Sequence, residues 1–333
     1  MTNSKNNNSN AAYVLADIGG TNARFALYTP NSDGGIQLRE QLQFRCRQFN
    51  DFSEALGTYL EQIGRPVDGA SVSIAGPADG DLIHMTNLNW TFSISEVKEA
   101  LGLQHMWVIN DATAAALSTT CETQLELIKP GHVETAAARI NLIPGTGFGI
   151  GSIMPLKNSW LAIQGEGGHA TLAPVTDEEF AVLQNITRAL GRAVNDIVLS
   201  GPGMLNIYRA LAAVRGQPPL DVDAKEMTRN ALEKHDATSV DALDMYCTLL
   251  GRLAGDIALT MNAHGGVYLS GDLLQRIGAE RISESFNRGF NDKGMMIEKV
   301  GRIPVYLLQS DYPCLKGAAV WLDSQLAALQ HAD

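Results

Sequence analysis

The stretch Tyr13-Val-Leu-Ala-Asp-Ile-Gly-Gly-Thr-Asn-Ala-Arg-Phe-Ala-Leu-Tyr28 decides the fold of this chain. Two apolar runs flank a glycine turn that spans Asp17 to Asn22, and this arrangement predicts a β-hairpin. The turn can be a simple tight hairpin, because glycine tolerates positive φ. It can equally be a phosphate cradle, because backbone N–H groups without neighbouring Cβ atoms approach phosphate oxygens closely. In such a cradle the Thr21 hydroxyl would add a donor, and Asp17 would hold Mg²⁺ through water.

The pattern of strand, glycine-rich turn and strand recurs. Arg139 to Ile143 leads into Pro144-Gly145-Thr146-Gly147, and Phe148 to Met154 is again strand-like. Residues 70–85 carry a third such pattern, with its turn at 76–81. The first turn is followed by a strand and by no Gly-Lys-Ser/Thr, so it is not a P-loop. Two hairpins that face each other can clamp a triphosphate from both sides, which favours phosphate binding at both glycine turns.

Helical and strand-like patterns alternate around these turns. Apolar residues have helical spacing at 51–63, 95–101, 111–121, 178–190, 239–263 and 315–329, and buried strands are expected at 106–109, 267–270 and 305–308. This alternation predicts α/β layers. A chain of 333 residues exceeds the size at which one core usually suffices, so we expect two domains with a cleft between them.

The pair Asn110-Asp111 stands where a buried strand ends and an alanine-rich helix begins. Both residue types are favoured N-caps, so the pair can be a helix cap and nothing more. The carboxyl end of a strand is also where α/β proteins bind ligands, and the positive end of a helix keeps a carboxylate ionised. Phosphoryl transfer to an alcohol uses such a group to orient the hydroxyl and accept its proton. Asp111 is therefore a candidate catalytic base.

Two further polar clusters can hold a sugar. Gly165-Glu166-Gly167-Gly168-His169 offers a carboxylate that accepts from hydroxyls and an imidazole that donates or accepts. Zinc is less well explained, because only two ligands are visible. Asn87-Leu88-Asn89-Trp90 offers amides beside an aromatic ring, although an ordinary turn with a core tryptophan explains this segment equally well.

Composition limits the class of partner. The net charge of −11 argues against nucleic acid and acidic membranes as main partners. The four cysteines form no CxxC pair, which indicates reduced thiols and no structural zinc. Residues 1–10 are polar and Asn-rich, which is typical of a disordered tail rather than a signal peptide. No apolar stretch approaches the ~20 residues that span a bilayer, and we expect a cytoplasmic protein.

With these motifs together, the chain resembles the bacterial glucokinases, in the hexokinase group of the actin/Hsp70/sugar-kinase superfamily. The resemblance runs from about Tyr13 to Leu329. It rests on residues 15–27, Met85-Thr-Asn-Leu-Asn-Trp90, Ile109-Asn-Asp-Ala-Thr-Ala114, Pro144-Gly-Thr-Gly-Phe-Gly149, Gly165-Glu-Gly-Gly-His169 and Leu199-Ser-Gly-Pro-Gly203, in this order. It implies a two-domain α/β actin-like ATPase (ribonuclease H-like) fold with a central cleft. Residues 11–121 plus 310–333 would form the small domain and residues 122–309 the large domain.

The resemblance also implies a role for each matched residue. MgATP would bind at the loops that comprise Ala16, Asp17, Ile18, Gly19, Gly20, Thr21, Asn22, Gly145, Thr146 and Gly147, and at Gly271 in Val267-Tyr-Leu-Ser-Gly271. Asp111 would take the proton from the sugar 6-hydroxyl, and glucose would bind at Asn87, Asn110, Asp111, Glu166, His169 and Asp196. The implied reaction is transfer of the γ-phosphoryl group of ATP to D-glucose, the first step of glycolysis, by a homodimer.

Two positions depart from the family pattern. Asp196 stands where glutamate is usual, and one methylene less should weaken or lengthen its contact with the sugar. Asp272 follows Gly271 where a second glycine is usual, and its side chain and charge should alter nucleotide choice. The alternatives are therefore a kinase for another hexose and a non-catalytic sugar sensor on the same fold. The acidic chain carries no basic helix-turn-helix appendage, which argues against a DNA-binding sensor.

Overall fold

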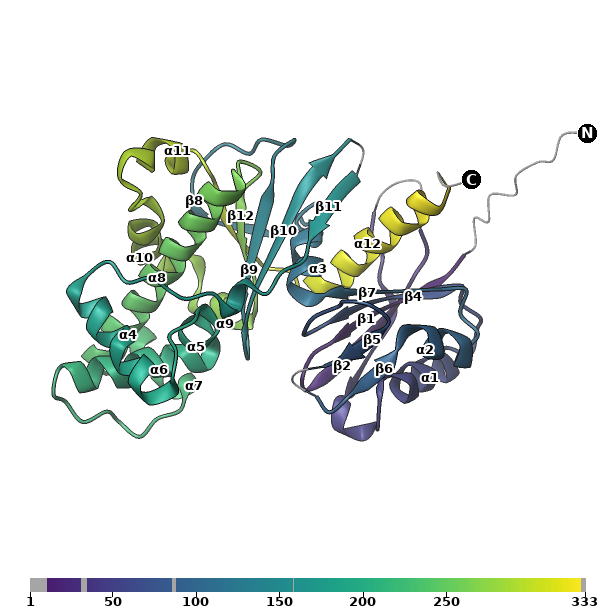
Figure 1. The fold of residues 1–333 in the computed structure, drawn as a ribbon, viewed down its shortest axis with the longest axis horizontal. Helices are drawn as coiled ribbons and strands as arrows, with labels where there is room; N and C mark the ends of the chain where they lie inside the picture. The colour runs from purple at the N-terminus through teal and green to yellow at the C-terminus, as the bar shows by residue number, and fades with distance from the viewer. Residues whose placement is uncertain (1–10, 31–34, 86–87, 158, 331–333) are drawn as a thin grey trace, which may run out of the picture. The chain divides into compact units, whose positions relative to one another are not determined.

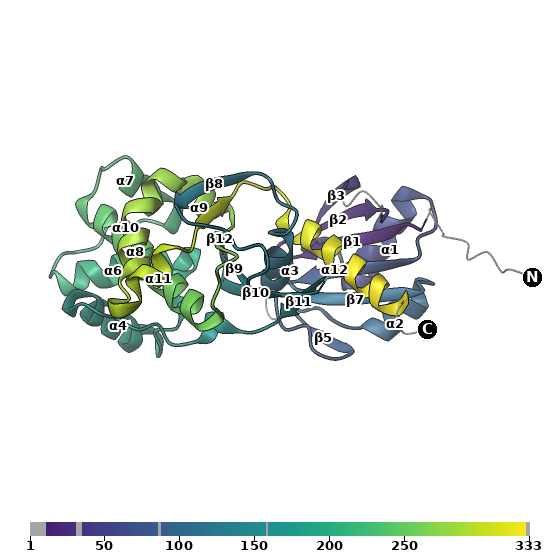
Figure 2. The same ribbon diagram turned by 90° about the horizontal axis from the view of Figure 1, so that it is seen from above.

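The computed structural model describes residues 11–30, 35–85, 88–157 and 159–330, and the chain divides into two compact units. Unit 1 runs to Cys121 and resumes at Asp311, whereas unit 2 comprises Glu122–Ser310. Each unit combines a mixed β-sheet with helices (Figures 1 and 2), so the α/β class expected from the sequence is confirmed. The polar tail expected at residues 1–10 lies outside the described residues.

Unit 1 is built on a sheet with the strand order β3-β2-β1-β4-β7. Its strands are β1 (Tyr13–Ile18), β2 (Asn22–Tyr28), β3 (Arg39–Arg45), β4 (Gly69–Ile74) and β7 (His105–Asn110). Strands β1 and β2 are antiparallel, which confirms the hairpin predicted around the first glycine turn. Strands β1, β4 and β7 are parallel, and their last residues Ile18, Ile74 and Asn110 lie in register. The carboxyl ends of these three strands therefore meet at one edge of the sheet.

The hairpin-like pattern at residues 70–85 does not form a hairpin. Strand β4 pairs in parallel with β1 and β7, whereas β5 (Leu82–His84) pairs with β6 (Thr91–Ser93) in a separate small sheet. Every residue of β4 is buried, so this strand belongs in the centre of a sheet covered on both faces. The apolar pattern was correct for each strand, but the pairing predicted between them is wrong.

Both faces of the unit 1 sheet are covered by helices. Tyr13 and Leu15 of β1 pack with Leu315 and Ala318 of α12 (Pro313–Gln330), while Val14 and Ala16 pack on the side of α1 (Phe52–Ile63). Figure 1 shows α12 beside α3 (Asp111–Ser118), with α1 and α2 (Ile94–Ala100) on the opposite face. A short 3-10 turn, η1 (Cys46–Gln48), follows β3. Alternation along β1 thus buries its side chains in two different cores.

Unit 2 is built on a sheet with the order β11-β10-β9-β12-β13-β8. Its strands are β8 (Leu125–Lys129), β9 (Arg139–Pro144), β10 (Phe148–Leu156), β11 (Ser159–Ile163), β12 (Val267–Leu269) and β13 (Val305–Leu308). Strands β9 and β10 form the second predicted hairpin, with Phe148 opposite Pro144. Strand β12 is parallel to β9 and β13, so it joins the hairpin to the later part of the chain.

Helices make up most of the remaining part of unit 2. They are α4 (Asp177–Leu190), α5 (Asn195–Leu199), α6 (Gly201–Val214), α7 (Ala224–Leu232), α8 (Ala237–Met261), α9 (Asp272–Ile277), α10 (Ala279–Asn291) and α11 (Ile297–Gly301), with 3-10 turns η2 (Gly167–His169) and η3 (Gly294–Met296). The helices predicted at 178–190 and 239–263 correspond to α4 and α8. Across the described ranges, no helix has the length and apolar character needed to cross a membrane.

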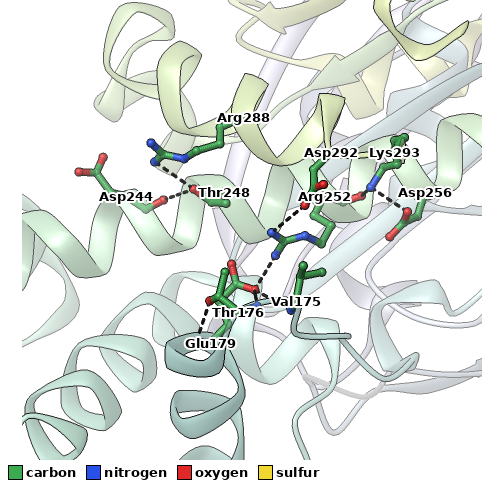
Figure 3. A network of polar contacts seen from close by, with 10 residues as sticks. All are labelled: Val175, Thr176, Glu179, Asp244, Thr248, Arg252, Asp256, Arg288, Asp292 and Lys293. Carbon is green, nitrogen blue, oxygen red and sulfur yellow. Dashed lines mark hydrogen bonds and ion pairs between the residues drawn. The ribbon is translucent and has the colours of Figure 1, made fainter. Parts of the chain in front are cut away.

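A buried ion pair joins α4 to α8. The Arg252 Nη1 atom lies 2.8 Å from Glu179 Oε2, and both side chains are buried. The same Glu179 oxygen accepts the backbone N–H groups of Val175 and Thr176, which precede α4, and Arg252 Nη2 lies 3.5 Å from Asp292 Oδ2 (Figure 3). The two charges therefore have partners beyond each other, as buried charges require.

Candidate active site

The β1–β2 turn presents its glycines at the carboxyl edge of the unit 1 sheet. The Gly19 N–H donates to the Asn22 carbonyl at 3.0 Å, which closes the turn, and Gly20 and Thr21 are exposed at its tip. The Cys46 N–H donates to the Thr21 carbonyl at 3.0 Å, and Arg45 Nη1 donates to Asn22 Oδ1 at 3.0 Å. The start of η1 thus holds the turn in place. Exposed backbone at a fixed turn is the geometry expected of an anion cradle.

Asp17 lies at the start of this turn but has a partner within the sheet. Its Oδ2 atom accepts from Arg24 Nη1 at 3.1 Å across the β1–β2 pair, and its side chain is 14% exposed. The pKa of Asp17 is raised above its usual value by burial, although the Arg24 charge and hydrogen bonds from Arg24 and Cys314 oppose that shift. Sequence analysis did not single out Arg24 as a partner of Asp17, although its polar position opposite Asp17 in an apolar strand was the available signal.

The side chains near Asp17 can hold Mg²⁺ only together with waters and substrate phosphates. Within the described residues there is no group of three or more His, Cys, Asp or Glu side chains that could hold a metal. Mg²⁺ is commonly held by one or two carboxylates together with waters and substrate phosphates. A single carboxylate beside a phosphate cradle fits that mode of binding, and it does not fit a metal site made of protein ligands alone.

The sequence left open whether the pair Asn110-Asp111 is a helix cap or a candidate catalytic base, and the structure assigns the cap to one of the two residues. Asn110 is the N-cap of α3: its Oδ1 accepts the Thr113 N–H at 3.2 Å, and its Nδ2 donates to the Gly76 carbonyl at 3.1 Å. Asp111 is the first helical residue and is half-buried, and its Oδ1 accepts the Ala112 N–H at 2.7 Å. The cap is therefore Asn110, and Asp111 presents its carboxylate at the positive end of α3.

Unit 1 brings the β1–β2 turn and Asp111 to the same edge of its sheet, because β1 and β7 end in register on either side of β4. The buried Cys314 at the start of α12 contacts both parts: its Sγ lies 3.6 Å from the Asp111 carbonyl, and it hydrogen-bonds Asp17. Burial and the nearby Asp17 and Asp111 raise the pKa of the Cys314 thiol well above its usual value. This cysteine is therefore a neutral packing residue beneath the site.

A cavity of about 710 Å³ opens beside the turn. It is lined within unit 1 by Gly20, Thr21, Arg45, Cys46, Arg47, Phe49, Asn50, Leu88, Asn89 and Trp90. Its size lies in the range of small-molecule sites. Asn87, predicted to bind sugar, lies outside the described residues, while its neighbours Asn89 and Trp90 line this cavity. Arg45 and Arg47 were not predicted, because a pair of arginines beside a strand is usually only a solvated edge.

In unit 2 the predicted segments gather around the β9–β10 turn. The Gly145 N–H donates to the Gly147 carbonyl at 2.8 Å, and Gly145 and Thr146 are exposed. Gly271 has φ of 105°, and a Cβ atom there would lie 2.8 Å from the Pro144 carbonyl oxygen. Only glycine suits that backbone conformation and that close approach. The adenosine-side residue of the resemblance therefore lies directly beside the second glycine turn.

The Glu166–His169 segment forms η2 and contacts the same strand. A Cβ atom at Gly168 would overlap with the Phe148 carbonyl oxygen, so the segment packs closely on the start of β10. The Asn195 side chain donates to the Gly167 carbonyl at 2.9 Å and fixes the turn from α5. The side chains of Glu166 and His169 are 51% and 67% exposed, and His169 Nε2 lies 3.9 Å from Glu166 Oε2. Both polar groups are thus presented to solvent on a fixed backbone.

Asp196 makes a contact that its sequence position did not suggest. Its Oδ1 atom accepts the backbone N–H of Phe148 at 2.7 Å, so the carboxylate is bonded to the end of the second glycine turn. The sequence placed Asp196 among sugar ligands alone. The bond joins residues 48 positions apart, and no local pattern carries a signal for it.

Solved structures of known proteins share the fold of this chain. The crystal structure of a glucokinase from an Antarctic psychrotroph superposes with a TM-score of 0.85 at 33% identity, and the match covers 94% of this chain and 99% of that chain. The two glycine-turn hairpins, each in its own α/β unit, thus belong to a hexose kinase of the actin-like ATPase fold.

The Glucokinase family model matches residues 14–325. Glucokinase from Saccharophagus degradans is 39% identical over 93% of this chain and 98% of that protein. Glucokinase from Chromobacterium violaceum is 38% identical over 94% of this chain and 90% of that protein. The chain therefore belongs to the glucokinase family.

Proposed function

We propose that this chain transfers the γ-phosphoryl group of ATP to the 6-hydroxyl of D-glucose, giving glucose 6-phosphate and ADP. Membership of the glucokinase family supports the reaction. The observation that carries the assignment of the site is the position of Asp111. Its carboxylate stands at the positive end of α3, at the sheet edge that also bears the β1–β2 turn.

In this proposal Asp111 orients the sugar 6-hydroxyl and accepts its proton as the oxygen attacks the γ-phosphorus. The helix end keeps the carboxylate ionised, and the bond from the Ala112 N–H to Oδ1 fixes its orientation. Asn110 caps the same helix and thereby holds Asp111 at the end of β7. Glu166, His169 and Asp196, together with Asn87 and Asn110, would bind the sugar hydroxyls.

The phosphates of ATP would lie against the two glycine turns, residues 17–22 and 145–147, with the adenosine near Gly271. Exposed backbone at Gly20, Gly145 and Thr146 supports this placement. Mg²⁺ bound with ATP supplies neutralising charge at the β- and γ-phosphates. Asp17 would hold that ion through water, since its Oδ2 already accepts from Arg24.

The proposal is tested by coupled-assay phosphorylation of glucose with MgATP, run beside mannose, fructose and glucosamine. We expect glucose to give the highest kcat/KM. Turnover of another hexose alone would leave the site assignment intact and overturn the substrate. Binding of sugar without turnover of any hexose would favour a sugar sensor.

Asp111→Asn tests the base. The asparagine keeps an oxygen for the Ala112 N–H but cannot accept a proton, so we expect turnover to fall about 10²- to 10⁴-fold. Sugar binding should persist, as measured by the change in intrinsic fluorescence on adding glucose. Asp177→Asn, at an exposed first-turn aspartate of α4, is the matched control and should leave turnover unchanged. Near-normal turnover of Asp111→Asn would show that the base lies elsewhere.

The resemblance also supports a cytoplasmic homodimer as part of this proposal. The acidic net charge of −11 agrees with substrates that are not nucleic acids. Sedimentation equilibrium of the full chain measures the oligomeric state directly. A mass of twice 35.8 kDa is expected, and a monomer across the working concentration range would contradict the dimer.

A further inference from the structure

The carboxylate of Asp196 is bonded to the backbone that leaves the second glycine turn. Asp196 lies in the first turn of α5, and its Oδ1 accepts the Phe148 N–H at 2.7 Å. Phe148 is the first residue of β10 and directly follows Gly147. A hydrogen bond from a backbone N–H to an ionised carboxylate is shorter and roughly twice as strong as a neutral one. This bond is therefore able to set where the turn ends.

The turn is shaped to admit that carboxylate. A Cβ atom built on Gly147 would lie only 2.7 Å from Asp196 Oδ1, a separation that real Cβ atoms essentially never show. The oxygen thus occupies space that exists because residue 147 is glycine. The glycine at this position is explained by the neighbouring carboxylate as well as by access to a phosphate.

A second bond from the same segment holds the other side of the turn. The Gly201 N–H donates to the Gly145 carbonyl at 2.9 Å, and Gly201 begins α6, which Ser200 caps through the Gly203 N–H. Both ends of the turn at 145–147 are therefore attached to residues 196–201. This attachment gives the Leu199-Ser-Gly-Pro-Gly203 motif a structural reason that the sequence did not provide.

We propose that Asp196 is a positioning residue for the phosphate turn at 145–147, in addition to its place in the proposed sugar site. The inference rests on the proposed function, because it concerns the same turn and the same carboxylate. Oδ1 holds the Phe148 amide, and Oδ2 has no hydrogen-bond partner within the described parts of the chain. One side chain then orders the nucleotide turn with one oxygen and receives a sugar hydroxyl with the other.

Thermodynamic linkage makes this arrangement reciprocal. If sugar binding orders the Asp196 carboxylate, it also orders the turn, and the affinities for sugar and nucleotide rise together by the same factor. From sequence, the shorter aspartate should weaken the sugar contact. In the structure, its Oδ1 accepts the Phe148 N–H at 2.7 Å. An aspartate at this position is therefore long enough to reach the backbone at the end of the turn.

The first test compares Asp196→Ala with Asp196→Asn. Asparagine keeps an oxygen that can accept the Phe148 N–H, whereas alanine removes it. At saturating glucose, we expect Asp196→Ala to raise the KM for MgATP about tenfold and Asp196→Asn to raise it less than about threefold. Both variants should raise the KM for glucose. An unchanged MgATP KM in Asp196→Ala, with a raised glucose KM, would reduce Asp196 to a sugar ligand and overturn the inference.

The second test uses a double-mutant cycle with Gly147→Ala. The added methyl group pushes against Asp196 Oδ1, so its effect on nucleotide affinity should be much smaller when Asp196 is already alanine. The dissociation constant of a non-hydrolysable ATP analogue, measured by titration calorimetry, provides the readout without turnover. Additive effects of the two substitutions would contradict the inference.

The calorimetric readout also separates the two proposals. If the wild-type chain phosphorylates no hexose but the cycle shows coupling, the proposed function fails and the positioning role stands. If the wild-type chain phosphorylates glucose but the cycle is additive, the positioning role fails alone. Asp177→Asn serves as the matched control, because Asp177 is also a first-turn aspartate and is exposed.

Discussion

At the residue scale, the ammonium group of Lys129 is surrounded by backbone carbonyls. Its Nζ lies 2.8–3.3 Å from the carbonyl oxygens of Pro130, Val300, Gly301 and Ile303, and the residue is buried. Val300 and Gly301 end α11, where the helix dipole favours a positive charge. The Lys129 side chain of β8 thus supplies N–H donors to a group of buried backbone carbonyls that includes the end of α11.

Replacing Lys129 by methionine should destabilise unit 2 by about 2–4 kcal/mol, because buried carbonyls lose their donor. The measurement is urea unfolding of the two proteins at pH 7. Lys299→Met, at an exposed lysine of α11 itself, should stay within about 0.5 kcal/mol of wild type. Equal effects of the two substitutions would show that the carbonyl contacts of Lys129 contribute nothing specific.

The same lysine gives the free energy of unfolding a defined pH dependence. Burial lowers the pKa of Lys129 from 10.5 to about 8. Between these values the unfolded chain binds the proton more strongly, so stability rises with pH by about 1 kcal/mol per pH unit. Below pH 8 both states are protonated and this contribution is constant. The difference in stability between wild type and Lys129→Met should therefore widen from pH 8 to pH 10, and a constant difference would contradict the shift.

At the element scale, the junction of α4 and α8 depends on the Arg252–Glu179 pair (Figure 3). Arg252→Met should cost about 3–5 kcal/mol, because it leaves the buried Glu179 charge without its partner. Adding Glu179→Gln should recover part of that loss, since the remaining group is neutral and still accepts from Val175 and Thr176. Thermal unfolding of the single and double variants provides the measurement.

The control for this pair is the exposed Arg229–Glu226 pair on α7, where Arg229→Met should change stability by less than about 1 kcal/mol. If Arg252→Met is no worse than Arg229→Met, the buried pair is not what holds α4 to α8.

The helices and hairpins that the sequence predicted correctly are those whose pattern lies within one short stretch of the chain. The helical spacing at 178–190 and 239–263 gave α4 and α8 with ends within a few residues, and both glycine-turn hairpins are present. The pattern at 70–85 gave two real strands but the wrong partner, because pairing in parallel with β1 and β7 depends on strands far along the chain. Periodicity reports which face of a strand is buried, not which strand lies beside it.

At the scale of the whole molecule, the last helix completes a unit begun by the first strand. Helix α12 packs on α3 and on Tyr13 and Leu15 of β1, and Tyr28 donates to Asp323 across 295 residues of sequence. The contact is close, since a Cβ atom at Gly317 would overlap with the Ala114 carbonyl. Unit 1 therefore cannot complete its core until the C-terminal helix is present.

Gly317→Ala should destabilise unit 1 by at least about 2 kcal/mol, because backbone atoms of α3 must move to admit the methyl group. Gly57→Ala provides the matched helical control: its Cβ would meet only Leu101 Cδ2 at 3.6 Å, so the higher helix propensity of alanine should leave stability unchanged or raise it by up to about 1 kcal/mol. Hydrogen exchange of the β1 and β4 amides measures both effects. Equal protection in the two variants would contradict the close approach of α12 and α3.

For the candidate site, the sequence indicated which segments carry polar chemistry. It did not indicate that Asn110 is the helix cap and Asp111 the candidate base, because a cap and a base have the same local pattern at the start of a helix. It also did not reveal that Arg24 pairs with Asp17, or that Arg45 and Arg47 line the cavity beside the turn. Those relations depend on strand register and on where η1 folds back.

The sequence by itself determined the α/β class, the two glycine-turn hairpins, and the position of Asp111 at the junction of strand and helix. These features depend on residues within about one element, where glycine, capping residues and periodicity act directly. The tertiary structure alone decided that Asp196 bonds the Phe148 amide and that β4 joins β1 rather than β5. Such contacts join residues that are far apart in sequence, and their geometry exists only after the chain has packed its cores.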